Sequence, residues 1–187
     1  MNTKEYLKQL SIVIFGILIA FWVNNIGVKY KDRETQKQVL LTILNELKDN
    51  NTNIKTTIQS LDTLSTTYSN IKNNDTESGV ATINYLGLQL KSIGYETAKY
   101  TGILKDVNYK LTSKIVENYE SQSYLEDSEK LVIDELFVLI KNKTNKGDEI
   151  DYLLLQILNF KNHLESIDNE QKQLIEDLNV FLGMESE

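Results

Sequence analysis

The strongest candidate for binding a ligand or a partner is the segment Tyr95–Leu104, with the sequence YETAKYTGIL. Glu96 and Lys99 are three residues apart, so on a helix they share one face and can form an ion pair. Gly102 permits a left-handed turn or a close approach of another backbone. The segment is therefore either a corner that contacts a ligand or partner, or a helix end with a glycine cap that packs Tyr95 into a core. The second interpretation needs no ligand and is favoured.

A second group of candidates lies in the apolar stretch near the N-terminus. The amides of Asn24 and Asn25 could hydrogen-bond across helices and hold an oligomer, or they could lie at the lipid headgroups without a partner. Gly16 and Ala20 have the small-xxx-small spacing that lets two membrane helices approach closely. All four residues are predicted interaction positions.

Catalytic and metal-binding patterns are missing from the sequence. His163 is the only histidine and there is no cysteine. One histidine cannot form a recognisable metal site or a Ser-His relay by itself. No phosphate-binding loop, dinucleotide-binding glycine pattern or HExxH motif is present. We predict no catalytic, cofactor-binding or metal-binding residue, no cofactor, and a protein that is not an enzyme.

The net charge argues against one class of partner. Residues 29–187 hold 18 lysines and arginines against 26 aspartates and glutamates, a net charge of −8. A nucleic-acid binder gains affinity by neutralising phosphates, so this sign predicts no nucleic-acid partner.

The apolar stretch itself is predicted to be a transmembrane helix over residues 10–28, preceded by a short tail at 1–9. It is about as long as a membrane span requires, with lysines on both sides and Trp22 and Tyr30 near one end. A cleaved signal peptide is disfavoured because no small-x-small cleavage site follows the apolar core. A buried core helix and an in-plane amphipathic helix are disfavoured because the run has no polar face.

Residues 29–187 are predicted to form a helical bundle domain, which makes the fold all-α. The chain contains no proline, as long uninterrupted helices require. The expected helices cover about 29–72, 80–92, 95–101, 109–141 and 148–182. A possible kink or break lies within 119–128.

Two of these helices carry matching heptad seams, so we expect them to be long and antiparallel, with the middle helices completing the bundle. The first seam contains Leu40, Leu47, Ile54, Leu61 and Tyr68, with Leu44, Asn51, Ile58 and Ser65 between them. The second contains Leu153, Phe160, Ile167, Leu174 and Phe181, with Ile157, Leu164, Gln171 and Leu178 between them. The transmembrane helix is expected to run into the first of these helices without a break.

Two segments together resemble an uncharacterised family of small single-pass membrane proteins of Bacteroidota. The first is GILIAFWVNN at 16–25 and the second is YETAKYTGIL at 95–104. The resemblance covers about the first 120 residues. The chain departs from the family pattern at Ile26, where the family usually has tryptophan. The resemblance implies membrane attachment and a helical domain, and it implies no activity.

These observations lead to two functional hypotheses. The first is a membrane-anchored helical interaction or scaffold protein, in contact with membrane lipid and assembling with itself or with a protein partner. The alternative is a membrane-coupled helical sensor module that signals through a partner. A single-pass protein of a bacterial inner membrane is expected. The basic residues after the span favour a cytoplasmic location for the helical bundle domain. The short N-terminal tail favours an extracytoplasmic location, and we prefer this second orientation.

Overall fold

The structure is a computed structural model that describes residues 3–74, 85–142 and 147–184. Within these ranges the chain forms helices and no strand, which confirms the predicted all-α fold. The elements are α1 (Thr3–Asn74), α2 (Ile93–Thr101), the short 3-10 helix η1 (Ile103–Asp106), α3 (Tyr109–Asn142) and α4 (Gly147–Leu182). The chain divides into two units, residues 1–39 and 40–187, which are described separately.

The N-terminal unit is the first part of α1. Its apolar side chains from Ile12 to Val28 are exposed, and no part of the membrane-length window is buried. A core helix of a soluble protein would be covered, so this finding argues against that alternative. The helix is long and apolar enough to cross a membrane, a test that an N-terminal signal sequence also passes. Residues 24–31 are helical, and α1 has no break there.

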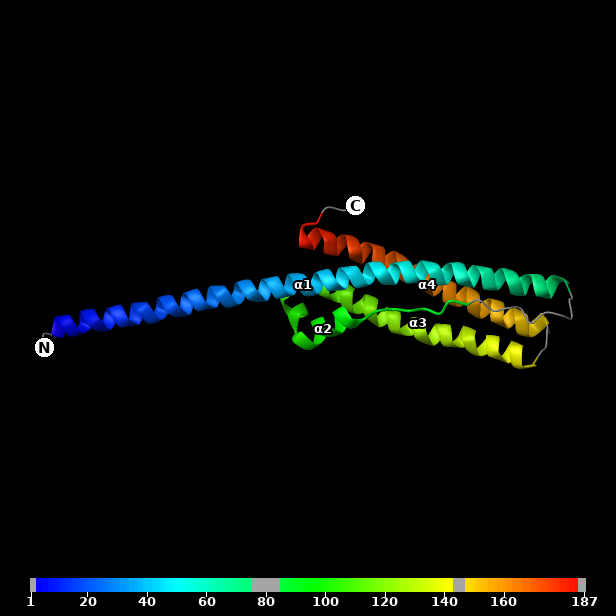
Figure 1. Ribbon diagram of the computed structural model, residues 1–187, viewed down its shortest axis with the longest axis horizontal. Helices are drawn as coiled ribbons and strands as arrows, with labels where there is room; N and C mark the ends of the chain where they lie inside the picture. The colour runs from blue at the N-terminus through cyan, green and yellow to red at the C-terminus, as the bar shows by residue number, and fades with distance from the viewer. Residues whose placement is uncertain (1–2, 75–84, 143–146, 185–187) are drawn as a thin grey trace. The chain divides into compact units, whose positions relative to one another are not determined.

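The C-terminal unit is built on three long helices, the second part of α1 with α3 and α4 (Figure 1). Contacts between α1 and α4 pair Asn51 with Asp168, Asp62 with Lys161, and Lys72 with Asp151. Partner numbers fall along α4 as they rise along α1, so these helices are antiparallel, as predicted. On α3, Tyr119 and Gln122 contact Glu46 and Asn50, so α3 runs parallel to α1.

The predicted seams form most of the core. Leu40, Leu47, Ile54 and Leu61 of α1 are fully buried, as are Leu153 and Leu164 of α4, and Phe160 is nearly so. Asn51 and Gln171, two of the three polar positions within the seams, are also buried, and the third, Ser65, is half-buried. Phe181 is an exception, because it is exposed on the last turn of α4, beyond the packed part of the helix.

The predicted helix at 80–92 is wrong for the residues that can be described. Residues 80–84 lie outside the described ranges, and residues 85–92 form no helix. We call this extended stretch, Tyr85–Ser92, the strap. Its apolar residues gave the helix prediction, but they pack against the core from an extended chain. Side chains of α1 and α3 replace the hydrogen bonds that a helix would have supplied to its backbone.

The remaining boundaries agree closely with the predictions. Gly102 closes α2 with a left-handed φ of 69°, the predicted cap conformation. Asn108 caps α3 because its Oδ1 accepts a hydrogen bond from the Leu111 backbone N–H at 2.9 Å. α3 continues through 119–128 without a break. The intervals between the predicted helices at 73–79 and 142–147 lie largely outside the described residues.

Candidate functional site

The predicted corner at Tyr95 is a buried junction of α1, α2 and α3. Tyr95 stacks on Tyr119 with the ring centroids 4.4 Å apart and the planes 5° from parallel. Glu46 of α1 is also buried, and its two carboxylate oxygens have separate donors. The Tyr119 hydroxyl donates to Oε1 and the Gly94 backbone N–H donates to Oε2, each at 2.7 Å. The pKa of Tyr119 is raised, mainly by burial of the hydroxyl and next by its hydrogen bond to Glu46.

Gly94 is required at this junction for its lack of a side chain. A Cβ atom there would lie 3.1 Å from Thr42 Cγ2, 3.2 Å from Glu46 Oε2 and 3.3 Å from the Ile43 backbone nitrogen. These distances are too short for an unstrained side chain, so glycine lets the start of α2 lie directly against α1.

Of the charged residues of the predicted corner, Glu96 lies in the first turn of α2 and Lys99 in its last turn. Among the described residues no ion pair joins Glu96 and Lys99. The Lys99 ammonium lies instead 5.7 Å from the centre of the Tyr95 ring, within the range of a cation–π contact. Leu104 is buried, and the space around Gly102 is open. The favoured interpretation, a capped helix end packed into the bundle, describes this geometry.

The strap is held by side chains that bind its backbone. The Asn50 amide forms two hydrogen bonds with the Lys91 backbone, both at 2.8 Å. Its Oδ1 accepts from the Lys91 N–H, and its Nδ2 donates to the Lys91 carbonyl. Asn53 Nδ2 donates to the Gln89 carbonyl at 2.7 Å, and Ser60 Oγ accepts from the Leu86 N–H at 3.0 Å.

Glu129 of α3 holds the strap from the other side. Its Oε1 accepts from the Leu88 N–H at 2.7 Å and from the Tyr85 hydroxyl at 2.8 Å. The backbone partners along the strap fall as the α1 numbers rise, so the strap runs antiparallel to α1. Every one of these bonds except that of Tyr85 is to main-chain atoms.

A chain of buried amides continues from the strap into the bundle. Asn50 Nδ2 also donates to Gln122 Oε1 at 3.2 Å, and Gln122 Nε2 donates to Asn118 Oδ1 at 2.8 Å. The Asn118 Nδ2 group has no partner among the described residues, and neither amide atom of Gln171 has one. Asn118 lines a cavity of about 190 Å³ between α3 and α4. The amide chain therefore ends in a buried donor without a described partner, on a residue that lines this cavity.

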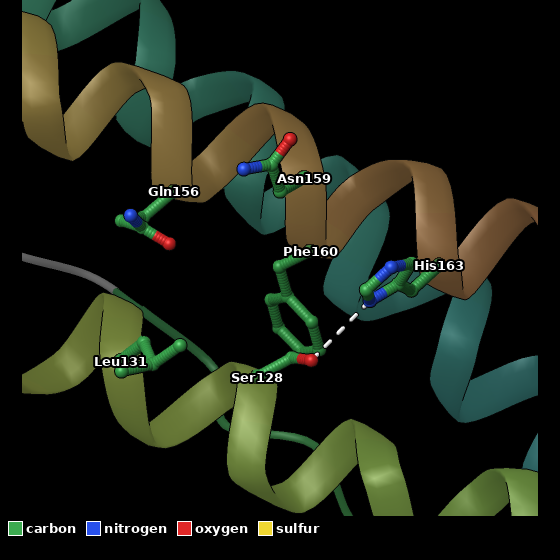
Figure 2. A pocket seen from close by; sticks show the side chains of 6 residues that line it. All are labelled: Ser128, Leu131, Gln156, Asn159, Phe160 and His163. Atoms are coloured by element: carbon green, nitrogen blue, oxygen red, sulfur yellow. Dashed lines mark hydrogen bonds between the residues drawn. The ribbon is translucent and has the colours of Figure 1, made fainter.

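A second hollow between α3 and α4 has a volume of about 240 Å³ and is lined by Ser128, Leu131, Gln156, Asn159, Phe160 and His163 (Figure 2). His163 Nδ1 lies 3.3 Å from Ser128 Oγ. The Ser128 hydroxyl also bonds to the Tyr124 carbonyl at 3.1 Å. His163 is exposed, and no described acidic group orients its ring, so the pair lacks the third member of a relay.

Leu131, which lines this hollow, belongs to one of two parallel rows of exposed side chains on α3. The apolar row is Tyr124, Leu131 and Val138, which are spaced by seven and are 71%, 53% and 42% exposed. The acidic row is Glu120, Asp127 and Asp134, also spaced by seven and exposed. Residues seven apart share one helix face, so each row is continuous along α3. None of the three carboxylates forms an ion pair with a described residue.

The other predicted interaction residues lie in the N-terminal unit. Asn24, Asn25, Gly16 and Ala20 are exposed on α1, and nothing lies within 4 Å of a Cβ built on Gly16. Their proposed role in helix association stays a prediction. Among the described residues no group of three or more His, Cys, Asp or Glu side chains could hold a metal ion.

The comparisons with known proteins were negative: no protein family, curated protein or solved structure matches the chain. The resemblance to a Bacteroidota membrane family therefore stays an expectation from two sequence segments.

A row of polar residues in the sequence of α1 indicated the strap contacts, but the predicted packing of α1 rested only on the neighbouring apolar seam. Glu46, Asn50, Asn53, Thr57 and Ser60 are separated by four, three, four and three residues, which places them on one face of α1. A polar row beside an apolar seam indicates a polar neighbour, here a backbone. Glu129 gave no such signal, because its role depends on where the strap lies.

Proposed function

We propose that this protein is a membrane-anchored helical interaction or scaffold protein without enzymatic activity. One observation carries the proposal: the heptad-spaced apolar row of α3, with its acidic row alongside, stays exposed, and its central residue Leu131 lines the α3/α4 hollow. Exposed apolar residues at heptad spacing are the pattern that a further helix covers by knobs-into-holes packing. The acidic row selects a helix with basic residues beside its apolar seam.

The proposed location follows from the N-terminal unit. The apolar part of α1 anchors the protein in a bacterial inner membrane as a single span, and residues 40–187 lie on the extracytoplasmic side. The exposure of every apolar side chain from Ile12 to Val28 supports this proposal, because lipid would cover them. Gly16, Ala20, Asn24 and Asn25 are available on this segment for contacts between spans.

The test is chemical crosslinking in native membranes followed by size analysis. The wild-type chain is compared with a Leu131→Asp/Val138→Asp variant and with a control variant, Leu155→Asp, on the outer face of α4. All three residues are exposed, so the fold is expected to survive each change. Loss of the crosslinked assembly in the double variant alone supports the proposal. The proposal is contradicted if the wild-type chain stays monomeric and crosslinks to no partner.

One observation favours the alternative of a membrane-coupled sensor module. Asn118 lines a cavity of about 190 Å³, and its buried Nδ2 group has no described partner, so a small polar molecule that reached this group would satisfy it. A sensor requires that such a molecule bind there and change the bundle. Calorimetry with candidate metabolites on wild type and Asn118→Leu checks this, and an identical heat in both variants would exclude Asn118 as the site.

A further inference from the structure

The polar face of α1 has the chemistry of a peptide-binding site. Asn50, Asn53 and Ser60 direct two amides and one hydroxyl at the strap, and Glu46 directs a carboxylate at the Gly94 N–H in the first turn of α2. Glu46, Asn50 and Ser60 are buried by these segments and their neighbours. All five contacted groups are backbone groups, three N–H donors and two carbonyls, and such groups are present in any extended peptide.

Selectivity at this face comes from a few positions. Tyr85, Leu88 and Leu90 are the half-buried residues of the strap, and all three pack against the core. Leu86 and Gln89 point away and are exposed. At one end, the Lys91 ammonium pairs with Asp49 at 2.6 Å. The preferred sequence is therefore an aromatic residue, leucines three and five residues later, and a basic residue after that.

We propose that the α1/α3 face that binds the strap is a receptor site for an extended segment of another protein with this pattern, and that the strap is its built-in occupant. Recognition by added main-chain hydrogen bonds with pockets for alternate side chains is a known mode of peptide binding. The site differs from the helix-binding row of the proposed function. Glu129 precedes Leu131 by two residues, which places the two side chains roughly 200° apart around α3.

The strap competes with any external segment. It is tethered at a local concentration on the order of millimolar, so the wild-type chain binds an external peptide weakly. Weakening the apolar contacts of the strap leaves the α1 and α3 side chains in place and frees the face. A peptide that supplies the same contacts then binds more tightly.

The probe is a fluorescent synthetic peptide with the sequence of residues 85–92, YLGLQLKS, and the protein is the full chain in detergent micelles. The Leu88→Ser/Leu90→Ser variant is expected to bind the peptide at least tenfold more tightly than wild type. Adding Asn50→Leu to this variant is expected to remove at least tenfold of that affinity. A peptide N-methylated at the positions of Leu86 and Leu88 keeps the side chains but loses two donors, and it is expected to bind at least tenfold more weakly.

Absence of saturable binding to the Leu88→Ser/Leu90→Ser variant, with its helical circular dichroism unchanged, overturns the proposal. Equal binding of the N-methylated peptide overturns it as well, because recognition would then not depend on the backbone. If that variant loses helicity, hydrogen exchange on the wild-type chain decides. Excess peptide is expected to accelerate hydrogen exchange of the strap amides without changing the exchange rates of the α4 amides. If the exchange rates of the strap amides also stay unchanged, the proposal is contradicted.

Failure of this proposal and failure of the proposed function can be told apart. Leu131→Asp is expected to leave peptide binding unchanged while it removes assembly in membranes. In the Leu88→Ser/Leu90→Ser variant, Asn50→Leu is expected to weaken peptide binding at least tenfold and to leave assembly in membranes unchanged.

Discussion

Asn50 both accepts a hydrogen bond from the strap backbone and donates one to it, so its removal is a sharp test of that contact. Asn50→Ala removes the acceptor of the Lys91 N–H, the donor to the Lys91 carbonyl and the donor to Gln122 Oε1. A typical hydrogen bond contributes about 0.5–1.5 kcal/mol net. The two bonds to Lys91 therefore stabilise the closed strap by roughly 1–3 kcal/mol, which corresponds to about a 5- to 150-fold change in its opening equilibrium.

The assay is hydrogen exchange of the full chain in micelles, resolved to single residues. The Lys91 amide lies outside any helix or strand, yet we expect it to be protected in wild type and to exchange about 5- to 150-fold faster in Asn50→Ala. Asn53→Ala is the matched control, since Asn53 donates to a carbonyl and accepts no strap N–H. A wild-type Lys91 amide that exchanges like a free peptide, or an equal effect of both variants, would refute the reasoning.

Four further predictions concern the junction, the Gly102 cap and the exposed row. Gly94→Ala forces a Cβ to within 3.1–3.3 Å of α1 and is expected to destabilise the fold by about 1–3 kcal/mol in thermal unfolding. Gly102→Ala, with open space but a positive φ, should cost about 1–2 kcal/mol and disturb no α1 contact. The pKa of Tyr119 is raised above 10.0, so the folded state keeps a proton that the unfolded chain loses. Stability should be full below pH 10 and should fall above it by up to about 1.4 kcal/mol per pH unit, with a smaller slope in Tyr119→Phe unfolding titrations. Leu131→Asp should leave the unfolding midpoint nearly unchanged, because Leu131 is half exposed.

The long helices could be predicted because their signals are local and repeated. The seams from Leu40 to Tyr68 and from Leu153 to Leu178 mark the buried faces of α1 and α4. Gly102 and Asn108 mark ends that depend on single residues with one preferred backbone or side-chain role.

The strap could not be predicted because its conformation is decided by distant residues. Leu86, Leu88 and Leu90 alternate in a way that fits either a short helix or an extended chain. The hydrogen bonds that select the extended form come from Ser60 and Asn50, up to 41 residues away in sequence. The sequence predicted the corner at Tyr95 as a packed helix end. It did not predict that Glu46 and Tyr119 complete this corner, because only the fold brings them together.

The proposed helix-binding row of α3 is most directly tested by site-specific photocrosslinking in native membranes. A photoreactive residue is placed at position 131, in the apolar row, and in a matched chain at position 130, an exposed neighbour off that row. We predict an adduct with a second protein chain from position 131 and none from position 130, lost when Asp127 and Asp134 are changed to lysine. Equal labelling from both positions, or no adduct from position 131, would contradict a helix partner at this row.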